Sequence, residues 1–335
     1  PFIAACGGML LPVLVFMSIC PPGSEGGQGL AIPMATDIAF SLGVLSLLGS
    51  RVPLSLKIFL TAFAVVDDIG GILVIAIFYS SHVSYGYILV AVLLYILLYF
   101  IGKRGATNKI FFLVIGVVIW YLFLQSGIHS TISGVILAFV IPAKPRLDVG
   151  KYIEHIRHTI AGFPVMESGS IVLTNEQIAK LKEVESASDR VISPLQSFED
   201  NLHGAVNYLI LPLFAFVNAG VVFSGGGELV GDVGIAVAAG LLFGKFAGIY
   251  FFTWLAIKIK LTPMPPGMTW TNLSGIALLG GIGFTVSLFI ANLSFGANFP
   301  ILLNQAKFGV LSGTILSGLL GYIVLWIVLP ARRRK

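Results

Sequence analysis

The stretch SLKIFLTAFAVVDDIGGILVIAIFY, residues 55–79, places two adjacent aspartates in the middle of a long apolar segment. Its 25 residues are enough to cross the hydrocarbon core of a bilayer as one helix, which takes about 20, and Asp67 and Asp68 are the thirteenth and fourteenth of them. Ionisable side chains at that depth are costly and rare, and by default they mark a substrate or ion pathway. This stretch therefore predicts both the environment of the chain and a site within it.

The composition of the whole chain agrees with a membrane environment. Hydrophobic residues make up 57% of the 335 residues and charged residues 10%, whereas roughly a quarter of the residues of a soluble domain are charged. The composition predicts an all-α polytopic membrane protein, whose first partner is the lipid bilayer. About ten transmembrane helices are expected, at residues 2–19, 30–49, 55–79, 84–101, 110–124, 127–141, 204–222, 233–257, 272–295 and 306–329.

The distribution of basic residues predicts the topology. Among the connections between the apolar segments, Lys and Arg occur only in alternate ones, after the second, fourth, sixth, eighth and tenth segments, and Lys307 at the outer end of the last segment is the one exception to this pattern. The positive-inside rule places these connections in the cytoplasm, which predicts a multi-pass protein of the plasma membrane, that is, a bacterial inner membrane. The net charge of +5 then follows from topology, and no nucleic-acid partner is expected.

The chain divides into three parts. Residues 1–143 hold the first six transmembrane helices, residues 144–202 form a polar cytoplasmic connector, and residues 203–335 hold the last four helices. Within the connector, residues 174–177 read TNEQ, which fits a capping box followed by a short amphipathic helix.

Two sets of three segments indicate an internal repeat with inverted topology. By the predicted topology, the first three and the last three segments run in opposite orders across the membrane, and the central segment of each set is irregular. The irregularity is Pro33 to Asp37 in the first set; in the last it is Gly280, Gly281 and Gly283, each of which weakens a helix by about 1 kcal/mol relative to alanine. Two interrupted helices in inverted repeats are typical of transporters with a site at the membrane midplane.

Four ionisable residues are expected near that midplane: Asp37, Asp67, Asp68 and Lys245. Inserting them costs about 2.5–3.5 kcal/mol each, so they must be used or mutually satisfied. Since adjacent helical residues diverge by about 100°, one of Asp67 and Asp68 can pair with Lys245 while the other faces a cavity. Carboxylate oxygens suit a hard cation such as Na⁺, Li⁺ or Mg²⁺, and burial makes a carboxylate bind a proton more readily. A carboxylate that holds either a cation or a proton is a chemical basis for their exchange.

The interrupted helices give the remaining charges a second role. Their ends inside the membrane each carry about half an elementary charge, positive at N-termini and negative at C-termini. Asp37 is suited to offset the positive ends and Lys245 the negative ends. The alternative is that Asp37 or Asp67 forms a purely structural ion pair with Lys245, which would leave two of the three acids unpaired.

At these residues the chain resembles the NhaA-type sodium/proton antiporters, a family of inverted-repeat transporters. The matching stretches follow one another in the family's order and cover nearly all the membrane segments. They are 31–40 (AIPMATDIAF), 47–54 (LLGSRVPL), 57–76 around the paired aspartates, 126–131 (SGIHST), 209–216 (LILPLFAF), 241–245 (LLFGK) and 280–285 (GGIGFT).

The resemblance implies a role for each residue of the site. It implies that Asp68 is the principal Na⁺ ligand and that Asp67 is its neighbour, which titrates with Lys245. It further implies that Thr36 and Asp37 lie in one of two crossing extended chains, with the glycine-rich break in the other.

The resemblance also bears on regulation and assembly. His203 matches a position linked in the family to pH response, while His129 is expected to have a packing role. Family members carry two further helices before the matching region, so the chain is expected to begin inside the protein. A homodimer is a possible assembly.

The predicted function is secondary active exchange of Na⁺ or Li⁺ for H⁺ by alternating access, in pH and sodium homeostasis. The alternative is a sodium-coupled solute transporter of similar fold. No enzyme and no cofactor are expected: an intramembrane aspartyl protease would carry a Gly-x-Gly-Asp signature, which the sequence lacks. Ten segments with a glycine break also disfavour a retinal protein with its Schiff base at Lys245.

Overall fold

The computed structural model describes residues 1–79, 83–104, 108–143, 149–162, 174–220, 230–296 and 298–330, and every regular element in these ranges is helical. The α-helices are α1 Phe2–Ile19, α2 Ile38–Ser46, α3 Leu54–Phe78, α4 Tyr85–Lys103, α5 Lys109–Ser126, α6 Thr131–Val140, α7 Val149–Ala161, α8 Asn175–Val191, α9 Pro194–Ala205, α10 Leu211–Asn218, α11 Asp232–Ala239, α12 Lys245–Lys258, α13 Trp270–Leu279, α14 Phe284–Phe295 and α15 Pro300–Val328. Short 3₁₀ helices are η1 Glu25–Gly29, η2 Ile32–Met34 and η3 Gly49–Arg51, and the π-helical turns are η4 Val206–Ile210 and η5 Gly240–Gly244.

The prediction of an all-helical polytopic membrane protein is confirmed, with fewer full spans than expected. Among the described residues, six helices are long and apolar enough to cross a bilayer, or eight if each of two bent pairs is one span. The predicted segment 127–141 holds only α6, with 10 residues, and the predicted segment 204–222 holds the end of α9, the π-helical turn η4 and the eight-residue α10. α6 is short because the chain turns at Gly127, where φ is 81°, and because the helix ends just before Pro142, which disfavours helical geometry at the residue before it.

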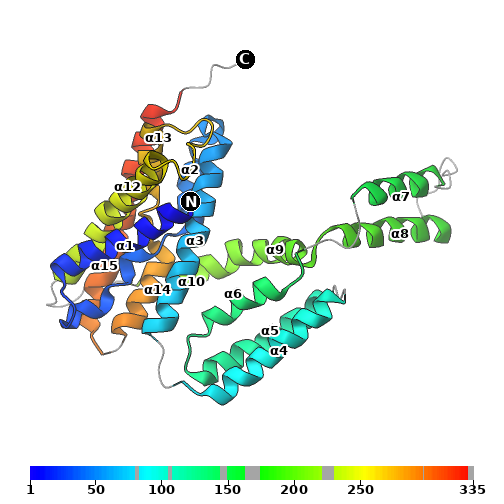
Figure 1. Ribbon diagram of the computed structural model, residues 1–335, viewed down its shortest axis with the longest axis horizontal. Coiled ribbons are helices and arrows are strands. Elements are labelled where there is room, and N and C mark those ends of the chain that lie inside the picture. The colour runs from blue at the N-terminus through cyan, green and yellow to red at the C-terminus, as the bar shows by residue number, and fades with distance from the viewer. Residues whose placement is uncertain are drawn as a thin grey trace. The chain divides into compact units, whose positions relative to one another are not determined.

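The chain forms two compact units, one of residues 1–80 and 207–335 and the other of residues 81–206. In the first unit, α1 lies along α12 (Figure 1), and glycines allow the two backbones to approach closely. A Cβ atom at Gly248 of α12 would overlap the carbonyl oxygen of Gly7, and one at Gly244 would lie 2.6 Å from the Cα of Pro12. Small residues at such positions let membrane helices pack in van der Waals contact, and here they hold α12 firmly against α1.

Two helix pairs in the first unit are interrupted, as predicted. The segment Glu25–Met34 and α2 form one pair, bent by 46°, and α13 and α14 form the other, bent by 44°. The backbone of the first pair is extended at Ala35 (φ −76°, ψ 144°), and α14 begins only after Gly283. The predicted irregularities are therefore real breaks at which helical hydrogen bonding stops.

The second unit contains α4 to α9. α4, α5 and α6 pack on one another around Leu98, Phe112 and Ile119, and the hydroxyl of Tyr95 donates to the carbonyl of Ser133 at 2.6 Å.

The segment predicted as a connector contains two helices, α7 and α8, that pack together. The capping box of α8 is formed: the backbone N–H of Gln177 donates to the hydroxyl of Thr174, and its side chain accepts from the Thr174 N–H. The segment predicted as a connector thus holds α7 and the start of α9 in addition to the one helix expected there.

Candidate functional site

Lys245 lies at the first residue of α12, directly after the π-helical turn η5, and its side chain is 0% exposed. π-helical turns are rare and often occur at functional sites, because they change the direction in which the next side chains point. The glycine contacts with α1 fix this helix in place, so the position of the Lys245 ammonium is set by backbone packing and not by its flexible side chain alone.

The ammonium of Lys245 pairs with one of the three candidate acids, Asp67 on α3. Its Nζ lies 2.6 Å from Asp67 Oδ2, and both side chains are fully buried. The same Nζ donates to the hydroxyl of Thr36 at 2.9 Å and lies 5.6 Å from the centre of the Phe63 ring, within the range of a cation–π contact. Of the acids that the sequence allowed as partners of Lys245, Asp67 is the one that forms the ion pair.

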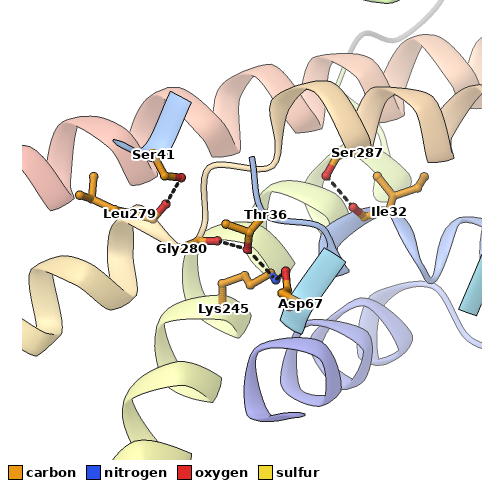
Figure 2. Close-up of polar contacts among 8 residues, drawn as sticks. All are labelled: Ile32, Thr36, Ser41, Asp67, Lys245, Leu279, Gly280 and Ser287. Carbon is orange, nitrogen blue, oxygen red and sulfur yellow. Dashed lines mark hydrogen bonds and ion pairs between the residues drawn. The ribbon is translucent and has the colours of Figure 1, made fainter. Parts of the chain in front are cut away.

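Thr36 connects this ion pair to the second interrupted helix. Its hydroxyl accepts from Lys245 and donates to the carbonyl of Gly280 at 2.8 Å, as Figure 2 shows. Gly280 is the residue that ends α13, where carbonyl groups lack partners within the helix and carry partial negative charge. Lys245 is thus connected to the C-terminal end of α13 through the hydroxyl of Thr36, and its predicted compensation of the negative helix ends stays a prediction.

Asp37 lies at the N-termini of α2 and α14, which are the second halves of the two interrupted helices and carry positive partial charge there. Its Oδ1 accepts from the backbone N–H of Phe40 at 3.1 Å and so caps α2, while its Oδ2 accepts from the backbone N–H and the hydroxyl of Thr285, at 3.0 and 2.6 Å. Thr285 is the second residue of α14. Since the N-termini of α2 and α14 meet at one carboxylate, Asp37 stabilises both helix starts at once and forms no ion pair with Lys245.

The two breaks cross in antiparallel order. The backbone N–H of Asp37 donates to the carbonyl of Ile282 at 2.6 Å, Ser41 donates to the carbonyl of Leu279 at 3.0 Å and Ser287 donates to that of Ile32 at 2.7 Å. As the residue numbers rise from 32 to 41 along the first break, the residue numbers of their partners at the second break fall from 287 to 279. Figure 2 shows the Ser41 and Ser287 contacts on either side of Thr36. This order is the one expected for two repeats of opposite orientation.

The predicted glycines lie at this crossing because no side chain fits there. A Cβ atom at Gly283 would lie 2.8 Å from the carbonyl oxygen of Ala35, and one at Gly281 would lie 2.6 Å from the hydroxyl of Ser317. The sequence pattern did not single out Ser41, Thr285 or Ser287 as site residues, although hydroxyl residues beside a helix break are common capping groups. Their number and spacing next to the two breaks are the signal that could have found them.

Among the described residues, two carboxylate oxygens of the site have no hydrogen-bond partner. These are Oδ1 of Asp67 and Oδ1 of Asp68, both buried atoms. Asp68 follows Asp67 on α3 and so points about 100° away from it around the helix. Within the described residues, no group of three or more His, Cys, Asp or Glu side chains is placed to hold a metal ion. The hydrogen-bond acceptors without a partner therefore belong to two adjacent carboxylates, fewer protein ligands than a structural metal site has.

The predicted histidines lie in the other unit. His203 is in the last turn of α9, and His129 lies between α5 and α6, where its Nδ1 is 2.9 Å from the hydroxyl of Thr131. The remaining predicted site residues all belong to the unit of residues 1–80 and 207–335. A role of His203 in pH response stays a prediction.

Comparison with known proteins gives one consistent result. A profile of the family described as Na⁺/H⁺ antiporter 1 matches residues 1–325. A protein of Bacteroides thetaiotaomicron called Na⁺/H⁺ antiporter NhaA is 94% identical over 335 residues, which are 100% of this chain and 76% of the relative. Proteins of the same name from Bacteroides fragilis and Porphyromonas gingivalis are 80% and 45% identical, over 99% and 97% of this chain and 76% and 73% of their own lengths. The chain therefore belongs to the Na⁺/H⁺ antiporter 1 family, as a multi-pass transport protein of the bacterial inner membrane and not an enzyme.

Proposed function

We propose that this protein exchanges Na⁺ or Li⁺ for H⁺ across the inner membrane by alternating access, and so contributes to pH and sodium homeostasis. The observation that supports this most directly is the buried Asp67–Lys245 pair beside Asp68, at the crossing of two interrupted helices. The names of the relatives, which are Na⁺/H⁺ antiporters, agree with this chemistry.

The cation is held by Asp68 together with Asp67. Na⁺ and Li⁺ are hard cations that prefer oxygen ligands, and the partnerless Oδ1 atoms of these two residues are such ligands. Because a buried polar atom without a partner costs about 1–3 kcal/mol, filling these acceptors with a cation or a proton is favourable. Asp68 is the principal ligand, since none of the described cations forms an ion pair with it.

Protons compete with the cation for the same groups. A carboxylate oxygen that carries a proton cannot also coordinate Na⁺, so binding of one displaces the other. When Asp67 turns toward the cation, its bond to Lys245 weakens, and the ammonium is left in an apolar interior where an unpaired charge is costly. Release of a proton from Lys245 then accompanies cation binding. The ion pair thereby couples entry of the cation to exit of protons.

The interrupted helices couple binding to movement. Thr36 and Gly280 connect Lys245 to the end of α13, and Asp37 joins α2 to α14. A change in the pairing of Lys245 therefore changes a hydrogen bond at the point where the two breaks cross. Transporters of this type work by movement of one set of helices against another around such a site.

No observation favours the alternative of sodium-coupled solute uptake. That function would require a broad cavity with polar groups at the charged site. A cavity of about 600 Å³ in the described part of the chain is lined by none of the four midplane charged residues.

The decisive experiment replaces Asp68 by Asn in the full-length protein and measures Na⁺-driven proton flux in everted membrane vesicles with a pH-sensitive dye. We expect the flux to fall to background, because the amide keeps the shape but not the charge of the ligand. Asp232→Asn, at the start of α11, is the matched control and should leave the flux unchanged. Undiminished exchange by Asp68→Asn, at equal amounts of protein in the vesicles, would refute the assignment.

A further inference from the structure

A groove lies where α2, the beginning of α14 and α15 meet, outside the charged site. Its volume is about 600 Å³, within the usual range of ligand pockets of roughly 300–1,000 Å³. Apart from the hydroxyl groups of Thr314 and Tyr322, its lining is apolar. The apolar walls include Leu47, Ile282 and Leu311, and Gly318 leaves room between them.

The groove opens at an exposed apolar surface of the unit of residues 1–80 and 207–335. Leu47 and Ile315, which both line it, are 74% and 58% exposed; Ile315 belongs to the span α15, and Leu47 directly follows α2, the second half of a broken span. The surrounding medium at such a surface is lipid hydrocarbon and not water. An apolar groove between two spans is thus in direct contact with acyl chains.

The dimensions of the groove match one acyl chain. Leu311 and Tyr322 of α15 both line it and are 11 residues apart, which is roughly 17 Å along a helix axis. One leaflet contributes about 15 Å to the hydrocarbon core, so the groove is about as long as one chain of one leaflet.

A cation stands just beyond one end of the groove. Trp326 follows the groove residue Tyr322 by one helical turn, and the guanidinium of Arg51 lies 6.0 Å from the Trp326 ring. Arg51 donates through Nε to the carbonyl of Pro330 and through Nη2 to those of Trp326 and Leu329. In the described ranges its Nη1 has no hydrogen-bond partner, and so remains available to an external acceptor. By the basic-residue topology this is the cytoplasmic end, where basic groups between helices bind anionic lipid headgroups.

We propose that this groove binds one acyl chain of an anionic phospholipid from the cytoplasmic leaflet, with the phosphate at Arg51. The acyl chain lies against Leu47 beside the end of α2 and against Ile282 in the break before α14. Since α2 and α14 are the second halves of the two interrupted helices, the bound lipid contacts both of the elements that cross at the charged site.

The test uses photoactivatable phosphatidylglycerol with a diazirine in its acyl chain, incorporated into phosphatidylethanolamine vesicles that contain the full-length protein. After irradiation, mass spectrometry maps the labelled peptides. We expect adducts to concentrate on α2 and α15. In Gly318→Leu, whose side chain enters the groove, labelling should fall about tenfold, which corresponds to ~1.4 kcal/mol.

Matched variants keep the test interpretable. Gly134→Leu is the same substitution at an exposed position of α6, in the other unit, where a Cβ atom would meet nothing within 4 Å, and it should label like the native protein. Gly318→Ala places a Cβ 3.5 Å from Ile282, an ordinary contact, so it should fold normally and retain most of the labelling. Arg51→Gln should lose the preference for phosphatidylglycerol over a diazirine phosphatidylethanolamine, and Arg51→Lys should keep it.

Three results would each overturn the proposal. The first is labelling of lipid-facing helices in proportion to their exposure, with no concentration at the groove. The second is unchanged labelling in Gly318→Leu. The third is equal labelling by the zwitterionic probe in the native protein, which would show that Arg51 selects no headgroup.

Discussion

Asp37 and Thr285 should be energetically coupled, because one carboxylate oxygen of Asp37 accepts two hydrogen bonds from Thr285. The other oxygen accepts from the N–H of Phe40, and the Asp37 side chain is almost completely buried, with 3% of the residue exposed. A suitable substitution is Asp37→Asn, which retains size and shape but has a single acceptor oxygen and an NH₂ group. That side chain can serve α2 or α14, but not both.

The expected loss of stability is obtained by counting the lost bonds. In the better orientation the amide oxygen keeps both bonds to Thr285 and loses the one to Phe40, which costs about 1.5–3 kcal/mol for a charged acceptor. Loss of the negative charge at two helix N-termini adds about 0.3–1 kcal/mol for each. We therefore expect Asp37→Asn to lower the free energy of unfolding by about 2–5 kcal/mol.

A double-mutant cycle isolates the contact between the two helices. Thr285→Val removes the hydroxyl donor and keeps the shape, at an expected cost of about 1.5–3 kcal/mol. In Asp37→Asn the Thr285 hydroxyl bonds to a neutral oxygen and is worth less than when it bonds to a carboxylate. The double variant should therefore be more stable than the sum predicts by about 0.5–1.5 kcal/mol. Thr253 provides the control: it is also buried, but its hydroxyl bonds only within its own helix, to Ile249. Asp37→Asn and Thr253→Val should therefore be additive.

The measurement is equilibrium unfolding of the purified full-length protein in detergent, followed by helical circular dichroism. Additivity of Asp37→Asn with Thr285→Val, within the error seen for the Thr253 control, would contradict the claim that Asp37 joins α2 to α14. So would a loss of less than about 1 kcal/mol in Asp37→Asn, since at least one buried hydrogen bond must disappear.

Three further predictions concern the same crossing. Lys245→Met leaves the buried carboxylate of Asp67 without its cation, so the free energy of unfolding should fall by about 3–5 kcal/mol. The double variant Lys245→Met with Asp67→Leu should recover part of this loss. A single variant as stable as the native protein would contradict a buried ion pair. Gly281→Ala should destabilise strongly, because its methyl group meets a carbonyl oxygen and a serine hydroxyl, whereas Gly43→Ala on open helix surface should be neutral or stabilising by up to about 1 kcal/mol. Thr36→Val should cost about 2–4 kcal/mol by removing a bond to Lys245 and leaving a carbonyl without a partner, while Thr36→Ser should restore most of it; equal melting temperatures for the two variants would refute the relay.

Some elements of the fold could be predicted because their causes are local. Pro33 and the three glycines within 280–283 disfavour a continuous helix through the properties of those residues themselves, and both breaks occur where expected. The capping box at 174–177 is likewise formed by residues three positions apart. The predicted span 127–141 was too long, and the predicted span 204–222 contains a π-helical turn, since apolar composition does not show where a chain turns or where a helix changes its hydrogen-bond pattern.

The site was predictable in its members but not in its pairings. Asp37, Thr36, Asp67 and Lys245 do meet at the crossing, yet the serine and threonine partners of the breaks were not identified. A hydroxyl group in an apolar segment usually bonds within its own helix, so its sequence neighbourhood does not reveal a partner on another helix.

Residue order alone is enough to identify a polytopic membrane protein with charged residues inside its apolar segments, because the cost of placing a charge in hydrocarbon depends on the residue and the length of its apolar segment. The pairing of Lys245 with Asp67, a residue 178 positions away, and the joining of two helix starts by Asp37 emerge only when the helices are packed. Those choices depend on how α3 and α12 are rotated and how closely glycines let the backbones approach. A difference of one residue on a helix, about 100°, is enough to leave Asp68 outside the ion pair that Asp67 forms with Lys245.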